Sequence, residues 1–201
     1  MIDRKNITAI ILAGGKSSRM GTDKGLVDFN GQEMITYVLQ HVKVVANDVL
    51  IISNHTGYEK FGYPVCEDIH KNQGPLGGIH AGLLNSKTAW NLVIGCDLPF
   101  VTKEFLAFLV SSIAEGDALV PIHDSFAEPL CALYHQSSFP KIESLLLKQE
   151  LKMQTVVKEL DTIFIEVPTE IFNSTIIFRN INRPEDLSSN TNRGLLRVSV
   201  L

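Results

Sequence analysis

Two glycines and three cations follow the first apolar run of the sequence. Within residues 12–24, the pair Gly14-Gly15 is followed by Lys16, Arg19 and Lys24. A glycine turn lets backbone amides approach anionic oxygens closely, because no side chain intervenes. Lysine and arginine neutralise phosphate charge, and arginine can also bind a phosphate with two parallel hydrogen bonds. These residue types predict a site for a nucleoside triphosphate.

Two known phosphate-binding patterns are missing from this stretch. Neither G-x-G-x-x-G nor G-x-x-x-x-G-K-[ST] follows the first apolar run. A dinucleotide-binding or P-loop site is therefore disfavoured. A plain turn would account for the glycine pair alone, but the three cations favour phosphate binding.

Carboxylates that follow apolar runs form the second group of candidates. Asp97 comes directly after the run 90–96, and Asp68 follows the weaker run 63–66. Mg²⁺ is commonly held by one or two carboxylates together with substrate phosphate oxygens. From its segment alone, Asp97 is either such a ligand or a capping or turn residue. Asp68 can be a second metal ligand, a nucleotide contact or a turn residue.

Three further features have both a functional and a structural interpretation. Residues 74–78, Gly-Pro-Leu-Gly-Gly, can form a wall against a base or sugar, or an ordinary bend before a helix. Asn180 and Asn182 can bind a base or another substrate group through their amides. For Asn182, an N-cap position is a sufficient explanation.

The elements that must position these residues follow from the apolar pattern. Short apolar runs alternate with helical periodicity over the first 120 residues, which is typical of βαβ units and a parallel sheet. The predicted strands are 7–13, 49–52, 63–66, 90–95, 118–121, 128–134, 163–167 and 176–178. The predicted helices are 33–46, one from Ile79, one after Thr102 as N-cap, 137–160 with a break near Glu150, and one that starts at Asn182.

This order predicts an α/β fold, a Rossmann-like three-layer α/β/α domain with a mostly parallel sheet. The later, hairpin-like strands are expected to add a small antiparallel edge. Ligands bind such sheets beyond the carboxyl ends of the strands. We therefore expect the loops after residues 13, 53, 66 and 96 to lie near one another.

Composition limits the classes of function. The chain has 201 residues, a 45% hydrophobic and a 20% charged fraction, and a net charge of −4. We expect one domain over residues 1–201, with no assignment for the tail 188–201, and no nucleic-acid-binding surface. Three distant cysteines without a CxxC pair, and no run long enough for a membrane span, predict a reducing, cytoplasmic setting away from the membrane.

The stretch 12–24 also resembles a known pattern, LAGGxSxRMGxDK of the nucleotidyltransferases. Within them, the chain is most similar to the molybdenum cofactor guanylyltransferases, the MobA family. The supporting segments keep the order and spacing of that family from about residue 7 to 187. They are Glu67-Asp68, the glycine-rich segment 74–78, Cys96-Asp97-Leu98-Pro99-Phe100 and the segment 180–187, Asn-Ile-Asn-Arg-Pro-Glu-Asp-Leu.

The resemblance implies a role for each matching position. Backbone groups of four residues would hold the nucleotide: Leu12, Ala13, Gly14 and Gly15. Lys24 would contact its phosphates, and Asp68 its guanosine part. Asp97 would bind Mg²⁺ and the triphosphate, whereas Asn180 and Asn182 would lie on the molybdopterin side.

One segment departs from the family. Where its members tend to have a pair of arginines near residue 150, this chain has Leu151-Lys152. Lysine supplies charge to a pterin phosphate but not the two-pronged binding of arginine.

The implied reaction joins GMP from GTP to the terminal phosphate of molybdopterin and releases pyrophosphate. Arg19, Lys24 and Asp97 with Mg²⁺ would offset the charge of the phosphates. Molybdoenzyme maturation proteins are further expected partners. Two alternatives stay open: a sister enzyme that uses CTP or a sugar phosphate, and a non-catalytic nucleotide-binding or cofactor-delivery protein.

Overall fold

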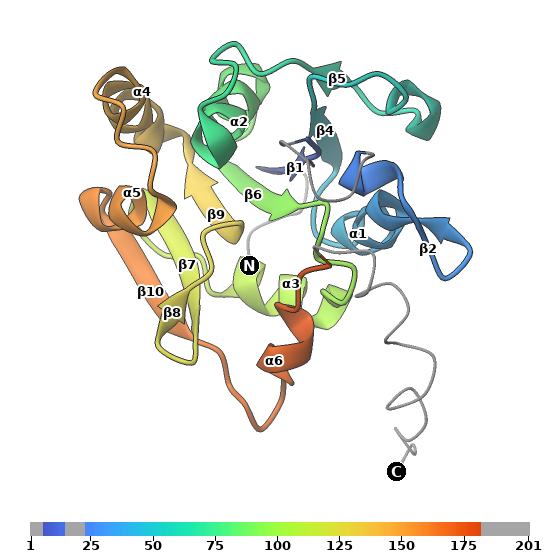
Figure 1. The fold of residues 1–201 in the computed structure, drawn as a ribbon. Coiled ribbons are helices and arrows are strands. Elements are labelled where there is room, and N and C mark those ends of the chain that lie inside the picture. The colour runs from blue at the N-terminus through green and yellow to red at the C-terminus, as the bar shows by residue number, and fades with distance from the viewer. Residues whose placement is uncertain (1–5, 15–22, 182–201) are drawn as a thin grey trace.

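The computed structural model describes residues 6–14 and 23–181. Its main sheet has the strand order β5-β4-β1-β6-β9-β7-β10, and β8 pairs with β7 (Figure 1). The strands are β1 (Ile7–Leu12), β4 (Asp48–Ile52), β5 (Val65–Cys66), β6 (Trp90–Gly95), β7 (Ala118–His123), β8 (Phe126–Ala127), β9 (Cys131–His135) and β10 (Thr162–Glu166). A separate small hairpin consists of β2 (Asp28–Phe29) and β3 (Gln32–Glu33).

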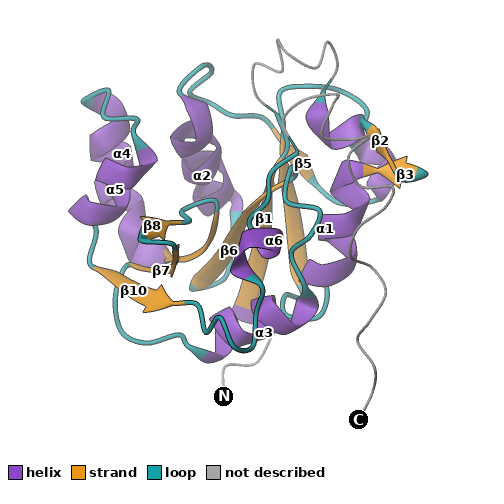
Figure 2. Ribbon diagram, turned by 60° about the horizontal axis from the view of Figure 1, so that its bottom comes forward, coloured by secondary structure: helices purple, strands orange, loops and turns teal. Residues whose placement is uncertain are grey.

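Helices cover both faces of this sheet, as Figure 2 shows. On one face, α1 (Met34–Val42), α3 (Lys103–Ser111) and α6 (Ser174–Ile177) share a hydrophobic cluster with the strands. On the other face, α2 (Gly74–Asn85), α4 (Phe139–Leu147) and α5 (Met153–Glu159) share a second cluster. Short 3₁₀ turns are η2 (Lys24–Leu26), η3 (Glu59–Phe61) and η4 (Gln136–Ser138). The predicted three-layer α/β/α fold is therefore confirmed.

The central strand β1 explains the continuous apolar run at the start of the chain. It pairs in parallel with β4 and β6, so that Ile10 lies opposite Leu50 on one side and Val93 on the other. Ile11 faces the first hydrophobic cluster and Ile10 the second, and both are fully buried. Because each face is covered, five of the six residues of β1 are apolar.

The antiparallel part of the sheet was expected at an edge, and that prediction is wrong. β9 lies inside the sheet, antiparallel to both β6 and β7, whereas the edge strand β10 runs parallel to β7. β7 does not pair with β6. The chain turns back through β8, and β9 then lies between β6 and β7. The predicted strand 128–134 also starts later, because Cys131 N–H closes a turn on Glu128 O at 3.1 Å.

The predicted strand 176–178 is wrong as well, because these residues end the short helix α6. The Asn173 side chain accepts a hydrogen bond from Ile176 N–H at 3.3 Å and so caps the first turn. Ile177 and Phe178 are buried against the α1–α3 face. A short apolar run does not distinguish a buried strand from a buried helical turn, and the cap decided it here.

The helices agree with the pattern in outline. α2 begins at Gly74 rather than Ile79, with Pro75 in its first turn, where a missing N–H costs nothing. The expected break in 137–160 separates α4 from α5, and Gln149 there has a φ of 59°. The tail 188–201 and the predicted helix start at Asn182 lie outside the described residues. Among the described residues, no helix has the length and apolar character to cross a membrane.

Candidate functional site

A cavity of about 1050 Å³ opens at the carboxyl ends of β1, β4 and β6. It combines all the predicted nucleotide-binding residues that the structure describes: Leu12, Ala13, Gly14, Lys24, Asp68 and Asp97. The prediction that these loops converge is therefore confirmed, while the role of each residue stays a prediction. Gly15, Lys16, Arg19 and Asn182 lie outside the described residues.

The turn after β1 forms the floor of this cavity. Ala13 N–H donates to Ile52 O at 2.9 Å, and Cys96 N–H donates to Leu12 O at 3.1 Å, so the strand ends are held together beyond the sheet. Gly14 then has a φ of 147°, a conformation that favours glycine. Its backbone can therefore come close to a bound group.

Lys24 and Asp97 meet in this cavity although they are far apart in the sequence. Lys24 Nζ lies 3.4 Å from Asp97 Oδ2, and each side chain is about one-quarter exposed (26% and 25%). Asp97 follows β6, and Lys24 begins the short turn η2. A cation beside a carboxylate at the end of a parallel sheet can bind both a phosphate and a metal ion.

Asp68 lies at the other side of the cavity, against the first turns of α2. Its Oδ1 accepts a hydrogen bond from His70 N–H at 2.8 Å, and its own N–H donates to Asn54 Oδ1 at 3.0 Å. Burial raises the pKa of this carboxyl, and the His70 N–H opposes that rise. Gly74, Pro75 and Gly78 of α2 also line the cavity, so the segment 74–78 forms both a wall and the start of a helix.

Gly77 leaves the space that the Asp68 carboxylate occupies. A Cβ at Gly77 would lie 2.6 Å from Asp68 Oδ2 and 2.8 Å from Oδ1. In Gly77→Ala the methyl group would displace the Asp68 carboxylate, and overpacking of this kind costs about 1–3 kcal/mol. Because Asp68 is a predicted nucleotide contact, we expect the KM for the nucleotide to rise about tenfold. Steady-state kinetics check it.

The matched control for this variant removes the carboxylate. In an Asp68→Ala background the added methyl group has room, so Gly77→Ala should raise the KM no further. A Gly77→Ala protein that binds nucleotide like the wild type would contradict the prediction.

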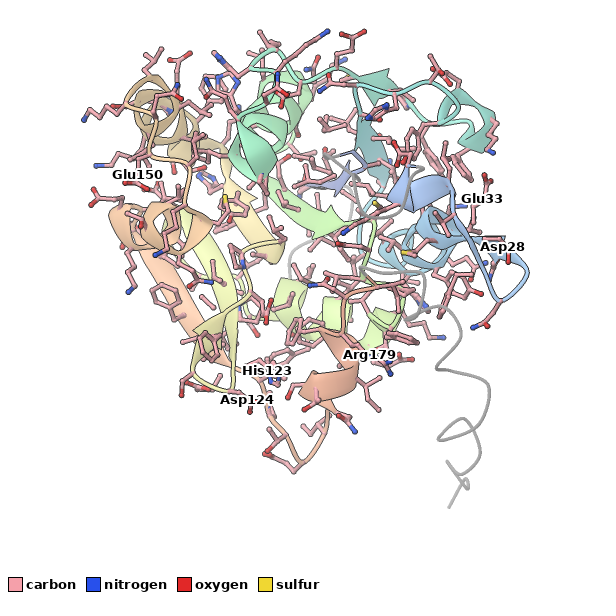
Figure 3. The ribbon with its side chains drawn as sticks, viewed as in Figure 1. Asp28, Glu33, His123, Asp124, Glu150 and Arg179 are labelled. Atoms are coloured by element: carbon pink, nitrogen blue, oxygen red, sulfur yellow. The ribbon has the colours of Figure 1, made fainter. Side chains whose placement is uncertain are left out.

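Asn180, the one predicted acceptor residue among the described residues, does not line this cavity. Asn180 is exposed after α6, and the next residue, Ile181, donates its N–H to Asp97 O at 3.1 Å. This bond ties the segment to the loop that carries Asp97. Figure 3 shows Arg179 and His123 on the α6 side of the molecule. The substituted segment Leu151-Lys152 connects α4 to α5, and Lys152 is exposed there.

Sequence reasoning missed six polar residues that line the cavity. The rule that placed Asp97, a polar residue directly after a buried strand, would also have found those that follow β4. Asp23 belongs to the stretch that resembles the nucleotidyltransferase pattern, and the resemblance implies no role for it. The six residues are Asp23, Ser53, Asn54, His55, Lys71 and Asn72.

Glu128 is a half-buried carboxylate in the turn between β8 and β9. Burial raises its pKa from 4.5 to about 7. Between these two values the folded protein keeps a proton that the unfolded chain has lost, so this group lowers stability as the pH rises from about 4.5 to 7.

Glu128→Gln should remove that pH dependence, because glutamine does not ionise. We expect the Tm of the variant to match the wild type near pH 4.5 and to exceed it by about 2–4 °C at pH 8. This shift corresponds to about 1 kcal/mol in a chain of this size, because solvent screens a partly exposed carboxylate and reduces the effect of its raised pKa. Thermal unfolding at several pH values measures it. Glu170→Gln, at an exposed position, is the control, and an equal response of the two variants would refute the assignment.

Known proteins are similar to this chain over most of its length. A family model described as MobA-like NTP transferase domain matches residues 9–163. A molybdenum cofactor guanylyltransferase of Vibrio parahaemolyticus is 31% identical over 94% of this chain and 96% of its own. A molybdenum cofactor guanylyltransferase of Vibrio atlanticus is 33% identical over 89% of this chain and 92% of its own.

The structural comparison leads to the same group of proteins. The crystal structure of molybdopterin-guanine dinucleotide biosynthesis protein A from Archaeoglobus fulgidus superposes with a TM-score of 0.76. It is 29% identical in sequence and covers 90% of this chain and 95% of its own.

Proposed function

The chain belongs to the family of MobA-like NTP transferase domains, and we propose that it transfers GMP from GTP to the terminal phosphate of molybdopterin. The observation that carries this proposal is the cavity in which Lys24 and Asp97 meet, and which Gly14 and Asp68 also line. The names of the relatives, molybdenum cofactor guanylyltransferase, support the choice of nucleotide and acceptor.

The proposed reaction needs no nucleophilic side chain. An oxygen of the acceptor phosphate attacks the α-phosphorus of GTP, and a new oxygen–phosphorus bond forms. The bond between the α-phosphorus and the bridging oxygen breaks, and its electron pair leaves with pyrophosphate. Because the acceptor oxygen is already ionised near neutral pH, no general base is required, and the protein acts by alignment and charge neutralisation.

We assign the neutralisation of the phosphate charge to cations of the stretch 12–24. Lys24, which lines the cavity, would contact the phosphates. Arg19, which is not among the described residues, would contact them as well. Gly14 and Gly15 would bring backbone amides to the nucleotide. Asp68 would bind the guanosine part from the α2 side.

Mg²⁺ is the cofactor that we propose, with Asp97 as its ligand. Within residues 6–14 and 23–181, no three His, Cys, Asp or Glu side chains are grouped to hold a metal by themselves. Mg²⁺ is usually bound through one or two carboxylates plus substrate phosphates and water, so Asp97 fits it without further protein ligands. Bound there, the ion would neutralise charge on the phosphate oxygens.

The acceptor side is assigned to the segment after α6. Asn180 and Asn182 would contact molybdopterin, and the Ile181–Asp97 hydrogen bond supports this by linking that segment to the nucleotide cavity. We further propose that molybdoenzyme maturation proteins receive the product. Three free cysteines, Cys66, Cys96 and Cys131, support a reducing, cytoplasmic setting.

The test is pyrophosphate release with purified molybdopterin and each of the four nucleoside triphosphates. We expect release that depends on the acceptor and is fastest with GTP. Faster release with CTP would replace the guanylyl assignment by the sister activity. Nucleotide binding without any release of pyrophosphate would favour a delivery protein instead.

A further inference from the structure

The Asp23 side chain joins the start of the η2 turn to a buried tyrosine from a different loop. Its Oδ1 accepts a hydrogen bond from Gly25 N–H at 3.1 Å, and this contact caps the turn that begins with Lys24. The same oxygen accepts a hydrogen bond from the hydroxyl of Tyr58, which lies between β4 and η3. Asp23 thus links the turn that begins with Lys24 to Tyr58.

Tyr58 is suited to be a fixed point of this arrangement. Its side chain is fully buried, at 0% exposure, in the cluster of the α1–α3 face. Burial raises the pKa of its hydroxyl far above the ordinary value, so the hydroxyl keeps its proton and remains a donor. Because packing holds the ring in place, the hydrogen bond from its hydroxyl restricts the position of the Asp23 carboxylate.

The turn itself is packed directly on this tyrosine. A Cβ at Gly25 would collide with Tyr58 Oη and would lie 3.1 Å from Cε1 of the ring. Gly25 is also buried. The backbone next to Lys24 therefore rests on Tyr58, both directly and through Asp23.

We propose that Tyr58 is a positioning residue that acts through Asp23 to hold Lys24 at the nucleotide phosphates. The proposal rests on the proposed function, because that function places Lys24 at the phosphates. It adds a residue outside the cavity lining, and it predicts that the hydroxyl of Tyr58, rather than its ring, matters for the reaction.

A double-mutant cycle between Tyr58→Phe and Lys24→Ala tests this dependence. Phenylalanine keeps the packing and removes the donor. Alone, Tyr58→Phe should lower kcat/KM for GTP about tenfold, the scale of one lost hydrogen bond to a charged group. In the Lys24→Ala background it should cost less than about twofold, the margin within which independent effects add. Equal losses in both backgrounds would overturn the proposal.

The matched control is Tyr134→Phe. Tyr134 is equally buried, and its hydroxyl donates to Pro129 O at 3.0 Å on the other face of the sheet. Removal of the Tyr134 hydroxyl should lower the Tm. The effect of Tyr134→Phe on kcat/KM should be the same with and without Lys24→Ala. A coupling of the same size for Tyr134→Phe would show that any buried hydroxyl has this effect and would refute a specific role for Tyr58.

Asp23 provides a second test, which does not need the tyrosine variant to fold. Asp23→Asn keeps an oxygen that accepts from both Gly25 N–H and Tyr58, whereas Asp23→Ala keeps none. The asparagine variant should keep a kcat/KM about tenfold higher than that of the alanine variant, because only asparagine retains the hydrogen bonds. Equal losses in the two would contradict positioning by hydrogen bonds.

The two proposals fail separately in this design. The nucleotide preference of the wild type tests the proposed function alone. The cycle is run with whichever triphosphate the wild type consumes, or with triphosphate binding if it consumes none. Additive effects then overturn the role of Tyr58 whatever the base or acceptor.

Discussion

Replacing Asp97 with alanine is expected to lower the rate of pyrophosphate release by about 10²–10³-fold, the usual cost of losing one group that stabilises developing charge. Asp97 is the carboxylate beside Lys24 in the nucleotide cavity. Without it, the site would lose its proposed Mg²⁺ ligand, and Lys24 would lose the carboxylate 3.4 Å away. Initial rates with GTP, molybdopterin and a series of Mg²⁺ concentrations measure the effect.

Two further results decide whether the metal is the reason. Asp97→Ala should need more Mg²⁺ than the wild type to reach its residual maximum rate. Asp48→Ala is the control, because Asp48 is exposed at the opposite end of the sheet, where β4 begins. A wild-type rate of Asp97→Ala at ordinary Mg²⁺ would contradict the metal assignment.

Lys24→Ala is expected to show the next largest loss, about 10²-fold in kcat/KM for GTP. The lysine lines the cavity and is held there by the capped turn η2. Its removal should weaken GTP binding also without Mg²⁺, which separates it from Asp97→Ala. Equilibrium binding of GTP in the presence of a chelator, together with initial rates, measures both effects.

The charge of Lys24 and its position can be distinguished with two variants. Lys24→Arg keeps the charge and should recover part of the lost rate, although the two head groups differ in shape. Lys87→Ala removes an exposed lysine ahead of β6, at the far end of the sheet, and should leave GTP binding unchanged. If Lys24→Ala bound GTP like Lys87→Ala, the phosphate contact would be refuted.

The parallel half of the fold was predictable because its strands are buried on both faces. Runs such as Ile7–Leu12 and Trp90–Gly95 read as strands whatever their neighbours are. The position of β9 was not predictable, because local pattern does not record which gap in a sheet a returning strand fills. The apolar residues at 176–178 are compatible with a strand or a helical turn, and the hydrogen bond from Ile176 N–H to the Asn173 side chain favours the helical turn.

The cavity was predictable to the extent that it lies where strands end. Gly14, Asp68 and Asp97 each follow a strand, and the carboxyl ends of parallel strands meet. Tyr58 was not found, because a tyrosine in a polar loop carries no local sign that its hydroxyl reaches Asp23. Its role depends on a contact between residues 35 positions apart.

Label transfer from GTP carrying a radioactive α-phosphate to molybdopterin tests the central claim most directly. The account predicts that the α-label appears in a new product that contains both the pterin and guanosine, with one pyrophosphate released for each label transferred. Transfer should require Mg²⁺ and should fall with Asp97→Ala and Lys24→Ala. Label that stays in GTP, or that appears only as free GMP when molybdopterin is present, would contradict the account.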